Sequence, residues 1–376
     1  MKITIAIDSF KGSLSSAEAA AAVKRGILRA DDTVVCDTFP VADGGEGLID
    51  ALQSPDSQVI TVPVHGPLFE NRNAHYLRRG QTAVIEMAAA SGLTFVPEPS
   101  RNPMETTSAG TGELMLHALE HGCTELLIGI GGSATNDGGI GMASALGFRF
   151  LDEKGKAVIP VGKNLSKIRK IDSTRATPLL KTAVIHAACD VDNPLCGVKG
   201  ASAVYGPQKG ATPAMIQELD KGLCNLAACS GRTAVAAEPG SGAAGGLGFA
   251  LRVFCNAVLE NGIELVLGAV GIEESLRTAQ LVITGEGRID SQTAYGKVPA
   301  GVATLAKKYH LPVVAFAGSI GEGTECLYGQ GIDAIVCIID APMDLHDAMS
   351  HASELLESAA FRTYKLFMAA HLNEKK

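Results

Sequence analysis

The sequence predicts an α/β protein with two unlike domains, on three observations. Short apolar segments alternate with helical segments near both ends of the chain, a pattern typical of a parallel sheet. The middle of the chain has closely spaced strand candidates, which favour antiparallel pairing. The 376 residues suffice for two or three domains. We therefore expect a doubly wound, Rossmann- or flavodoxin-like domain from residues 1–62 and 276–376, an inserted mixed α/β domain from 63–275, and an active-site cleft between them.

The N-terminal elements each have a local signal. Lys2–Ile7 is a short apolar strand candidate. A helix is expected to run to about Ala30, because residues 15–18 (SSAE) match a capping box ahead of an alanine-rich stretch. Thr33–Asp37 is a second strand candidate. This order of strand, helix and strand indicates parallel pairing.

The later elements follow the same reasoning. In the middle of the chain we expect strands at 59–65, 73–79, 83–87, 126–130, 148–152 and 182–189, and a helix at 213–229. From residue 280 the parallel pattern returns, with strands at 281–284, 313–317 and 334–338 and helices at 300–309 and 345–370. Asp344 is the expected N-cap of the last helix, because its carboxylate can accept a bond from the first turn.

Composition excludes several classes of protein. The net charge of −8 argues against binding to nucleic acid or to an anionic membrane. The nine cysteines form no C-x2-C pair, so a zinc ribbon is not expected. No run of about 18 apolar residues and no secretory signal is present, so we expect a cytoplasmic protein. No pattern specifies an oligomeric state.

Polar and glycine-rich loops follow the predicted parallel strands, where ligands bind in such sheets. Glycine-rich turns can cradle phosphate oxygens, acidic groups can hold Mg²⁺, and a lysine can neutralise transferring phosphate. Glycines cluster at 44–47, 129–141 and 240–248, which we predict to be loops, so we expect bulky substitutions at Gly132 or Gly245 to affect activity before folding. Together the loops indicate phosphoryl transfer. They lie at 8–11, 43–47, 131–139, 190–194 and 285–290.

Other functions are weighed against this one. The P-loop and protein-kinase motifs are absent. Residues Gly129–Ala134 fit a dinucleotide fingerprint with Asp152 about 20 residues further on, which keeps an NAD-type oxidoreductase as an alternative. Residues 136–139 (NDGG) would break the helix that this fingerprint needs. A two-domain protein that binds a small ligand without chemistry is a further alternative.

Taken together, the loop motifs resemble the type-1 glycerate kinase family, the bacterial glycerate 2-kinases. One departure is Ile7, where the family usually has proline. The resemblance implies two α/β domains with a cleft, ATP and Mg²⁺ as cofactors, and D-glycerate as substrate, with 2-phosphoglycerate favoured over 3-phosphoglycerate. The matching segments run in order along nearly the whole chain: 7–16 (IDSFKGSLSS), 41–47 (VADGGEG), 84–93 (VIEMAAASGL), 106–114 (TTSAGTGEL), 128–142 (IGIGGSATNDGGIGM), 189–197 (CDVDNPLCG), 242–248 (GAAGGLG) and 283–290 (ITGEGRID).

Three residues are the catalytic candidates under this interpretation. Lys11 is expected to contact the transferring phosphate or the glycerate carboxylate. Asp190 is expected to act as base or orienting group for the hydroxyl, and Asp43 is a rival acid. Asp192 is assigned to Mg²⁺. Asp190 and Asp192 would face opposite ways in an extended loop, so one of them points into the site.

The remaining candidates bind substrate or phosphate. Arg288 can clamp a carboxylate in a bidentate fork, with Asp290 orienting the arginine. The other expected substrate-binding residues are Asp8, Ser9 and Asn193. The expected nucleotide- and phosphate-binding residues are Gly131, Gly132, Ser133, Thr135, Asn136, Gly285 and Glu286.

Overall fold

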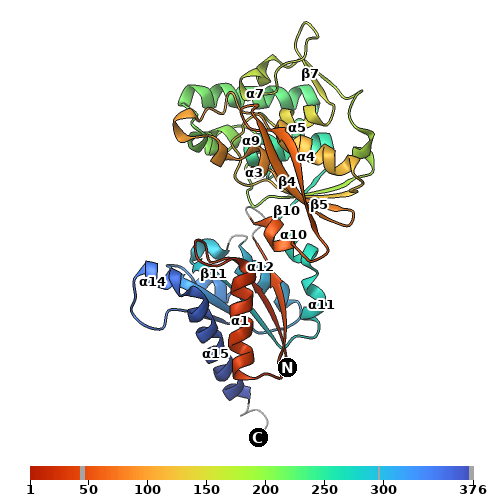
Figure 1. Ribbon diagram of the computed structural model, residues 1–376. Helices are drawn as coiled ribbons and strands as arrows, with labels where there is room; N and C mark the ends of the chain where they lie inside the picture. The colour runs from red at the N-terminus through yellow and green to blue at the C-terminus, as the bar shows by residue number, and fades with distance from the viewer. Residues whose placement is uncertain (43–46, 295–296, 372–376) are drawn as a thin grey trace. The chain divides into compact units, whose positions relative to one another are not determined.

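The computed structural model describes residues 1–42, 47–294 and 297–371 (Figure 1). The chain divides into two compact α/β units. The terminal unit consists of Met1–Asp43, Asp50–Leu52 and Ile263–Lys376, and the inserted unit of Gly44–Ile49 and Gln53–Gly262. The expected fold class, with one unit made from both ends of the chain, is confirmed.

The terminal unit contains a five-stranded, all-parallel sheet in the order β13-β12-β11-β1-β2. Two strands come from the N-terminal part and three from the C-terminal part, because the apolar runs at both ends need each other to complete one sheet. The strands are β1 (Lys2–Ile7), β2 (Val35–Pro40), β11 (Leu281–Ile289), β12 (Val313–Ile320) and β13 (Ala334–Cys337).

Helices cover both faces of this sheet. Ile3, Ile5 and Ile7 of β1 share a core with α1 (Ser16–Ala30) and α15 (Ala352–His371), which lie side by side (Figure 1). The alternate residues of β1 point to the other face, which α12 (Val298–Lys307) contacts. The remaining helices of this unit are α10 (Gly262–Val270), α11 (Ile272–Leu276), η6 (Ser291–Ala294), α13 (Glu325–Tyr328) and α14 (Leu345–Ser350).

The inserted unit contains a mixed six-stranded sheet in the order β10-β9-β6-β5-β4-β3. The β3-β4-β5 part is antiparallel and the rest is parallel. The strands are β3 (Gln58–His65), β4 (Asn71–Arg79), β5 (Thr82–Glu86), β6 (Glu125–Gly129), β9 (Val184–Ala188) and β10 (Val258–Glu260), with a separate pair formed by β7 (Arg149–Leu151) and β8 (Lys170–Asp172).

Helices of the inserted unit pack against this sheet around one large apolar core. They are α3 (Ala88–Ser91), α4 (Ala109–Glu120), α5 (Ile140–Ala145), α6 (Ala201–Tyr205), α7 (Pro213–Ser230), α8 (Thr233–Ala236) and α9 (Ala243–Cys255). The short α2 (Leu48–Leu52) lies at the first crossing between the units. Among the described residues, no helix is long and apolar enough to cross a membrane.

The structure differs from the sequence interpretation in the two domain boundaries, in one strand and in the last helix. The first boundary lies before β3 and not at residue 62, because β3 pairs with β4 along its whole length. The second lies at 262/263 and not at 275/276. Residues 285–289, expected in a loop, continue β11, since their backbone stays paired with β12. The last helical segment is two helices, α14 and α15, and Asp344 caps α14 by accepting a bond from the backbone N–H of Asp347 at 2.8 Å.

Candidate functional site

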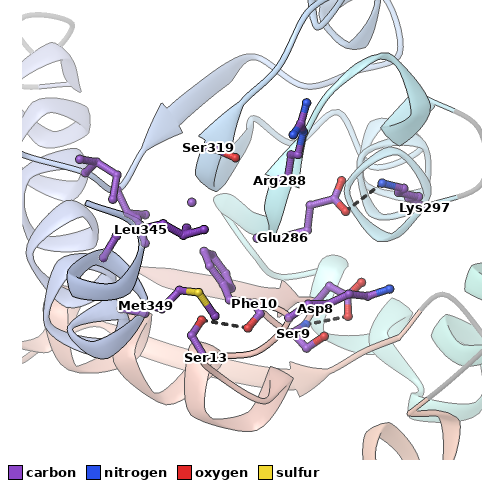
Figure 2. Close-up of a pocket in the computed structure, with 17 residues that line it drawn as sticks. Asp8, Ser9, Phe10, Ser13, Glu286, Arg288, Lys297, Ser319, Leu345 and Met349 are labelled. Atoms are coloured by element: carbon purple, nitrogen blue, oxygen red, sulfur yellow. Dashed lines mark hydrogen bonds and ion pairs between the residues drawn. The ribbon is translucent and has the colours of Figure 1, made fainter. Parts of the chain in front are cut away.

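A cavity of about 440 Å³ opens in the terminal unit, and we call it the terminal cavity (Figure 2). It lies at the carboxyl ends of β1, β11, β12 and β13, where parallel sheets bind ligands. Its lining comes from the turn after β1, the end of β11, the end of β12, the segment after β13, and helices α14 and α15: Asp8, Ser9, Phe10, Lys11, Ser13, Glu286, Gly287, Arg288, Lys297, Gly318, Ser319, Ile338, Ile339, Leu345, Ala348, Met349 and Ala352.

The terminal cavity has an apolar side and a polar side. Leu345 and Met349 of α14 lie on one side, and Glu286 and Arg288 of β11 lie on the other (Figure 2). Phe10 adds an aromatic ring between them. A cavity of this size with apolar walls and a few convergent polar groups is typical of a small-molecule site.

The turn after β1 holds the polar groups of the cavity floor. The backbone N–H of Ser9 donates to Oδ1 of Asp8 at 2.6 Å, and that of Phe10 donates to the Leu14 carbonyl at 2.8 Å. Lys11 is exposed, and none of the ion pairs between described residues includes it. The Lys11 ammonium is therefore available to a ligand.

Glu286 is the buried acid of this cavity, with 7% of its surface exposed. Its Oε1 accepts from the Thr293 hydroxyl at 2.6 Å, and its Oε2 lies 3.4 Å from Nζ of Lys297. Burial raises the pKa of Glu286, while Thr293 and Lys297 oppose that shift. Glu286 thus contributes a carboxylate whose geometry is set by two neighbours.

Arg288 projects from the end of β11, with 70% of its side chain exposed. Its Nε lies 3.2 Å from Oδ2 of Asp290, which itself lies outside the cavity lining. Gly285 does not line the cavity either. Its carbonyl accepts from the backbone N–H of Asp8 at 2.9 Å, so Gly285 supports the turn after β1.

A second cavity, of about 350 Å³, lies in the inserted unit, and we call it the inserted cavity. It opens at the carboxyl ends of β6 and β9, again as expected for parallel strands. Its lining is formed by Leu93, the turns after β6 and β9, the segment from α6 to η5 (Pro207–Lys209), and the start of α9: Ile130, Gly131, Gly132, Ser133, Ala188, Cys189, Asp190, Val191, Tyr205, Gln208, Lys209, Ala243 and Ala244.

Lys209 is the charged residue of this cavity that the sequence interpretation missed. Only 2% of its surface is exposed, and its Nζ donates to Oγ of Ser133 and to the carbonyl of Thr135, both at 2.7 Å. Burial lowers the pKa of Lys209 to about 7, and the charge of Asp137 opposes that shift. No signal in the segment Pro207–Gly210 distinguishes this lysine from a solvated loop lysine.

Asp137 holds the turn that carries Ser133. The carboxylate is fully buried and accepts from the backbone N–H and hydroxyl of Ser108 and from the backbone N–H groups of Gly139 and Gly141. Burial raises the pKa of Asp137, against these four bonds. Asp137 therefore fixes the turn between β6 and α5 from within.

Thr135 and Asn136 are buried within this turn, outside the cavity lining. Nδ2 of Asn136 donates to Oγ of Ser202 at 2.9 Å. Gly245 packs on the same turn with φ of +69°, where an added Cβ would lie 2.0 Å from the Thr135 carbonyl. This contact gives Gly245 a structural role, contrary to our expectation of an effect on activity first.

Of the two acids that follow β9, one lines the inserted cavity and the other lies in the loop outside it. Asp190 lines the inserted cavity, and its Oδ1 accepts from the backbone N–H of Gly262 at 2.8 Å. Asp192 is exposed and lines neither cavity. Asn193 accepts from the Tyr205 hydroxyl at 2.6 Å and donates to the Lys199 carbonyl at 2.7 Å, which gives it a place in the loop. Asp43 lies outside the described residues.

Among the described residues, the one cluster of three potential metal ligands is Asp344, His346 and Asp347, which is exposed and does not include Asp192.

Many of the predicted site residues line one of the two cavities. The terminal cavity brings together Asp8, Ser9, Lys11, Glu286 and Arg288, and the inserted cavity brings together Gly131, Gly132, Ser133 and Asp190.

Known proteins resemble this chain along nearly its whole length. The glycerate kinase family profile matches residues 3–368. A Bacillus subtilis (strain 168) protein named glycerate kinase is 49% identical over 96% of each chain, and an Escherichia coli (strain K12) protein named glycerate 2-kinase is 48% identical over 94% of each. A crystal structure of a candidate glycerate kinase 2 from Salmonella typhimurium LT2 has a TM-score of 0.90, with 46% identity over 99% of both chains. This chain belongs to the glycerate kinase family.

Proposed function

We propose that this protein is an ATP-dependent glycerate kinase, which transfers the γ-phosphoryl group of ATP to a hydroxyl of D-glycerate and releases ADP. Membership of the family supports this reaction. The observation that carries the proposal is the convergence of Lys11, Arg288 and Glu286 at the carboxyl ends of parallel strands. Phosphoryl transfer depends mainly on positioning and on neutralising charge, and exposed cations beside a cavity are suited to both.

Roles for the terminal cavity follow from its two sides. Lys11 contacts the transferring phosphate or the glycerate carboxylate, and Arg288, held by Asp290, clamps an oxyanion through its planar fork. Asp8 and Ser9 orient the substrate. The apolar side formed by Leu345 and Met349 suits a nucleoside better than it suits glycerate, which carries polar groups on every carbon.

Asp190 is the acid that we assign to the acceptor hydroxyl, because it lines the inserted cavity at a strand end. Mg²⁺ generally binds one or two carboxylates together with substrate phosphates and water. Exposed Asp192 fits such a role through one oxygen, and Asp43 is a further candidate acid. Bound Mg²⁺ would neutralise charge on the ATP phosphates.

The favoured product is 2-phosphoglycerate rather than 3-phosphoglycerate. The proposed partners are ATP and D-glycerate, with no role for nucleic acid or membrane, and the proposed compartment is the cytoplasm. A relative named glycerate 2-kinase supports the choice of hydroxyl.

The test is a coupled assay of ADP release with D-glycerate, followed by phosphorus NMR of the product. Lactate offers only the hydroxyl at carbon 2, and 3-hydroxypropionate offers only the one at carbon 3, so the pair separates the two positions. We expect ADP release that requires both D-glycerate and Mg²⁺. Oxidation of glycerate by NAD without ADP release would instead favour the oxidoreductase, and ligand binding without turnover would favour a binding protein.

A further inference from the structure

Lys209 is a buried lysine in the wall of the inserted cavity, and the described residues accept only two of its N–H donors. An ammonium group has three N–H donors. Two of them reach Ser133 and Thr135, and the described residues supply no third acceptor. No carboxylate lies in direct contact with Lys209 among the ion pairs of the described ranges. Burying a charge is costly unless an opposite charge accompanies it, and Lys209 lies in the wall of the inserted cavity.

The contact with Lys209 restricts the orientation of the Ser133 hydroxyl group. Its Oγ accepts from Lys209 Nζ, so its own O–H donor points elsewhere. Ser133 lines the same cavity as Lys209. Two donors, one of them cationic, are thereby presented to the same space, and such a pair suits an anionic oxygen.

Asp190 lines the cavity as well, and it accepts hydrogen bonds when ionised. A simple anion would be attracted by the Lys209 ammonium and repelled by the Asp190 carboxylate. A ligand that carries both an oxyanion and a hydroxyl satisfies both groups at once. A hydroxy acid has this combination, and so does a phosphate group beside an acceptor alcohol.

The geometry points to Lys209 and Ser133 as an oxyanion-binding pair of the inserted cavity, which holds a carboxylate or phosphate oxygen of the reactants while Asp190 accepts from a hydroxyl. This inference rests on the proposed function for the identity of the reactants. It adds to that function a binding residue in the inserted unit. The oxyanion is the glycerate carboxylate or the phosphoryl group, and the binding experiment distinguishes the two.

Proton uptake by Lys209 would provide an independent sign that an oxyanion binds beside it. The pKa of Lys209 is lowered to about 7 by burial, so the ammonium is largely neutral at pH 8.5. An oxyanion beside it favours the charged form, and binding then takes up a proton from solvent. The other titratable groups near this lysine are Asp137, Asp190, Cys189 and Tyr205. Burial raises the pKa of both Cys189 and Tyr205, which keeps them neutral at this pH.

The experiment measures binding by calorimetry for the wild type, Lys209→Met and the control Lys221→Met, whose lysine is exposed on α7. The ligands are D-glycerate, inorganic phosphate and MgATP, each tested separately. Loss of a charge-assisted hydrogen bond predicts about 10- to 100-fold weaker binding of one ligand to Lys209→Met. Weaker D-glycerate binding identifies the carboxylate, and weaker phosphate or MgATP binding identifies the phosphoryl group. Unchanged affinity for all three ligands in a folded variant overturns the inference.

A second measurement does not depend on the variant's folding. Calorimetry of the wild type at pH 8.5 in two buffers with different ionisation enthalpies reports proton uptake, which we expect on binding; its absence contradicts the inference. Ser133→Ala should weaken the same ligand. ADP release by the wild type tests the proposed function separately, because turnover combined with normal binding by Lys209→Met would reject only the role of Lys209.

Discussion

Lys11 and Lys209 differ in how far the free protein already fixes the position of the side chain. Lys11 is exposed on a turn, and its ammonium must be ordered by a ligand. Lys209 is buried, and two acceptors already hold it. Ordering a lysine side chain costs about 1.5–2 kcal/mol, so a prepositioned lysine loses less on binding. The first therefore suits a group that moves with the reactants, and the second suits a fixed anchor.

The Lys11→Ala variant is expected to lose about 10²-fold in kcat/KM, because it removes a charge next to the reacting groups. Steady-state ADP release with D-glycerate measures this loss. Circular dichroism should show an unchanged fold, since Lys11 is exposed, and Lys221→Ala serves as the matched lysine control. Near-normal turnover by Lys11→Ala would remove it from the catalytic assignment.

The Asp190→Asn variant removes the charge and keeps the shape. Its amide oxygen can still accept from Gly262, so the loop should stay in place. We expect kcat to fall by about 10²-fold or more, as for the loss of an acid–base group. Asp32→Asn, at an exposed position in the terminal unit, is the control. A larger effect at Asp192 than at Asp190 would reverse the assignment of base and metal ligand.

Lys209 also gives a pH dependence of stability with a definite sign. Its pKa in the folded protein is about 7, against 10.5 for a lysine in solution. Between these values the unfolded chain binds more protons than the folded chain, so the stability contribution from Lys209 rises with pH. Urea unfolding at pH 6.5 and pH 9 should show the wild type gaining stability relative to Lys209→Met. A difference that stays constant or shrinks over this range would contradict the shift.

At the scale of one element, the start of α1 shows that the segment 7–16 contains residues with a structural role as well as residues of the terminal cavity. Ser15 caps this helix: its Oγ accepts from the backbone N–H of Glu18 at 3.3 Å, and Oε2 of Glu18 accepts from the backbone N–H of Ser15 at 2.8 Å. The segment 7–16 thus contains both cavity residues and a helix cap. Only the cavity residues should affect catalysis.

The Ser15→Ala variant is expected to lower the free energy of unfolding by about 1 kcal/mol, the usual effect of losing an N-cap. Denaturant unfolding measures this change, and kcat and KM should stay at wild-type values. The pKa of Glu18 is lowered mainly by its bond from the Ser15 backbone, so the cap contributes at neutral pH and weakens as the acid is protonated. A catalytic defect without a stability defect would place Ser15 in the site instead.

At the scale of the whole molecule, ligands should stabilise the fold in proportion to their binding. MgATP at about 100 times its Kd is expected to add roughly 2.7 kcal/mol, a Tm increase of several degrees for a chain of this size. NAD should have no such effect, because the turn after β6 leads into the short α5 and not into a long dinucleotide-binding helix. Thermal unfolding with each ligand measures the difference, and protection by NAD alone would revive the oxidoreductase alternative.

Sequence reasoning succeeded where a pattern is local. The strands of the terminal sheet, five of the six strands of the inserted sheet, the capping box before α1 and the cap at Asp344 depend on residues close together in the chain, which form apolar runs and cap signals. The short edge strand β10 was not predicted. Loops at strand ends were also identified in this way, since a parallel sheet gathers them at one edge. The polar residues Asp8, Ser9, Lys11, Glu286 and Arg288 of the terminal cavity were predicted because each follows or ends a strand.

Tertiary structure decided what depends on distant partners. Lys209 meets Ser133 across 76 residues of sequence, and its burial cannot be inferred from its neighbours in the chain. Residues 285–289 form a strand because β12 supplies their hydrogen bonds, although glycines within the segment resemble a loop. The sequence by itself determined the fold class, the family and the polar loops at the ends of the parallel strands. The grouping of those loops into two cavities and the buried lysine in one of them were decided only by packing, since burial and hydrogen-bond pairing belong to the folded chain and not to any segment.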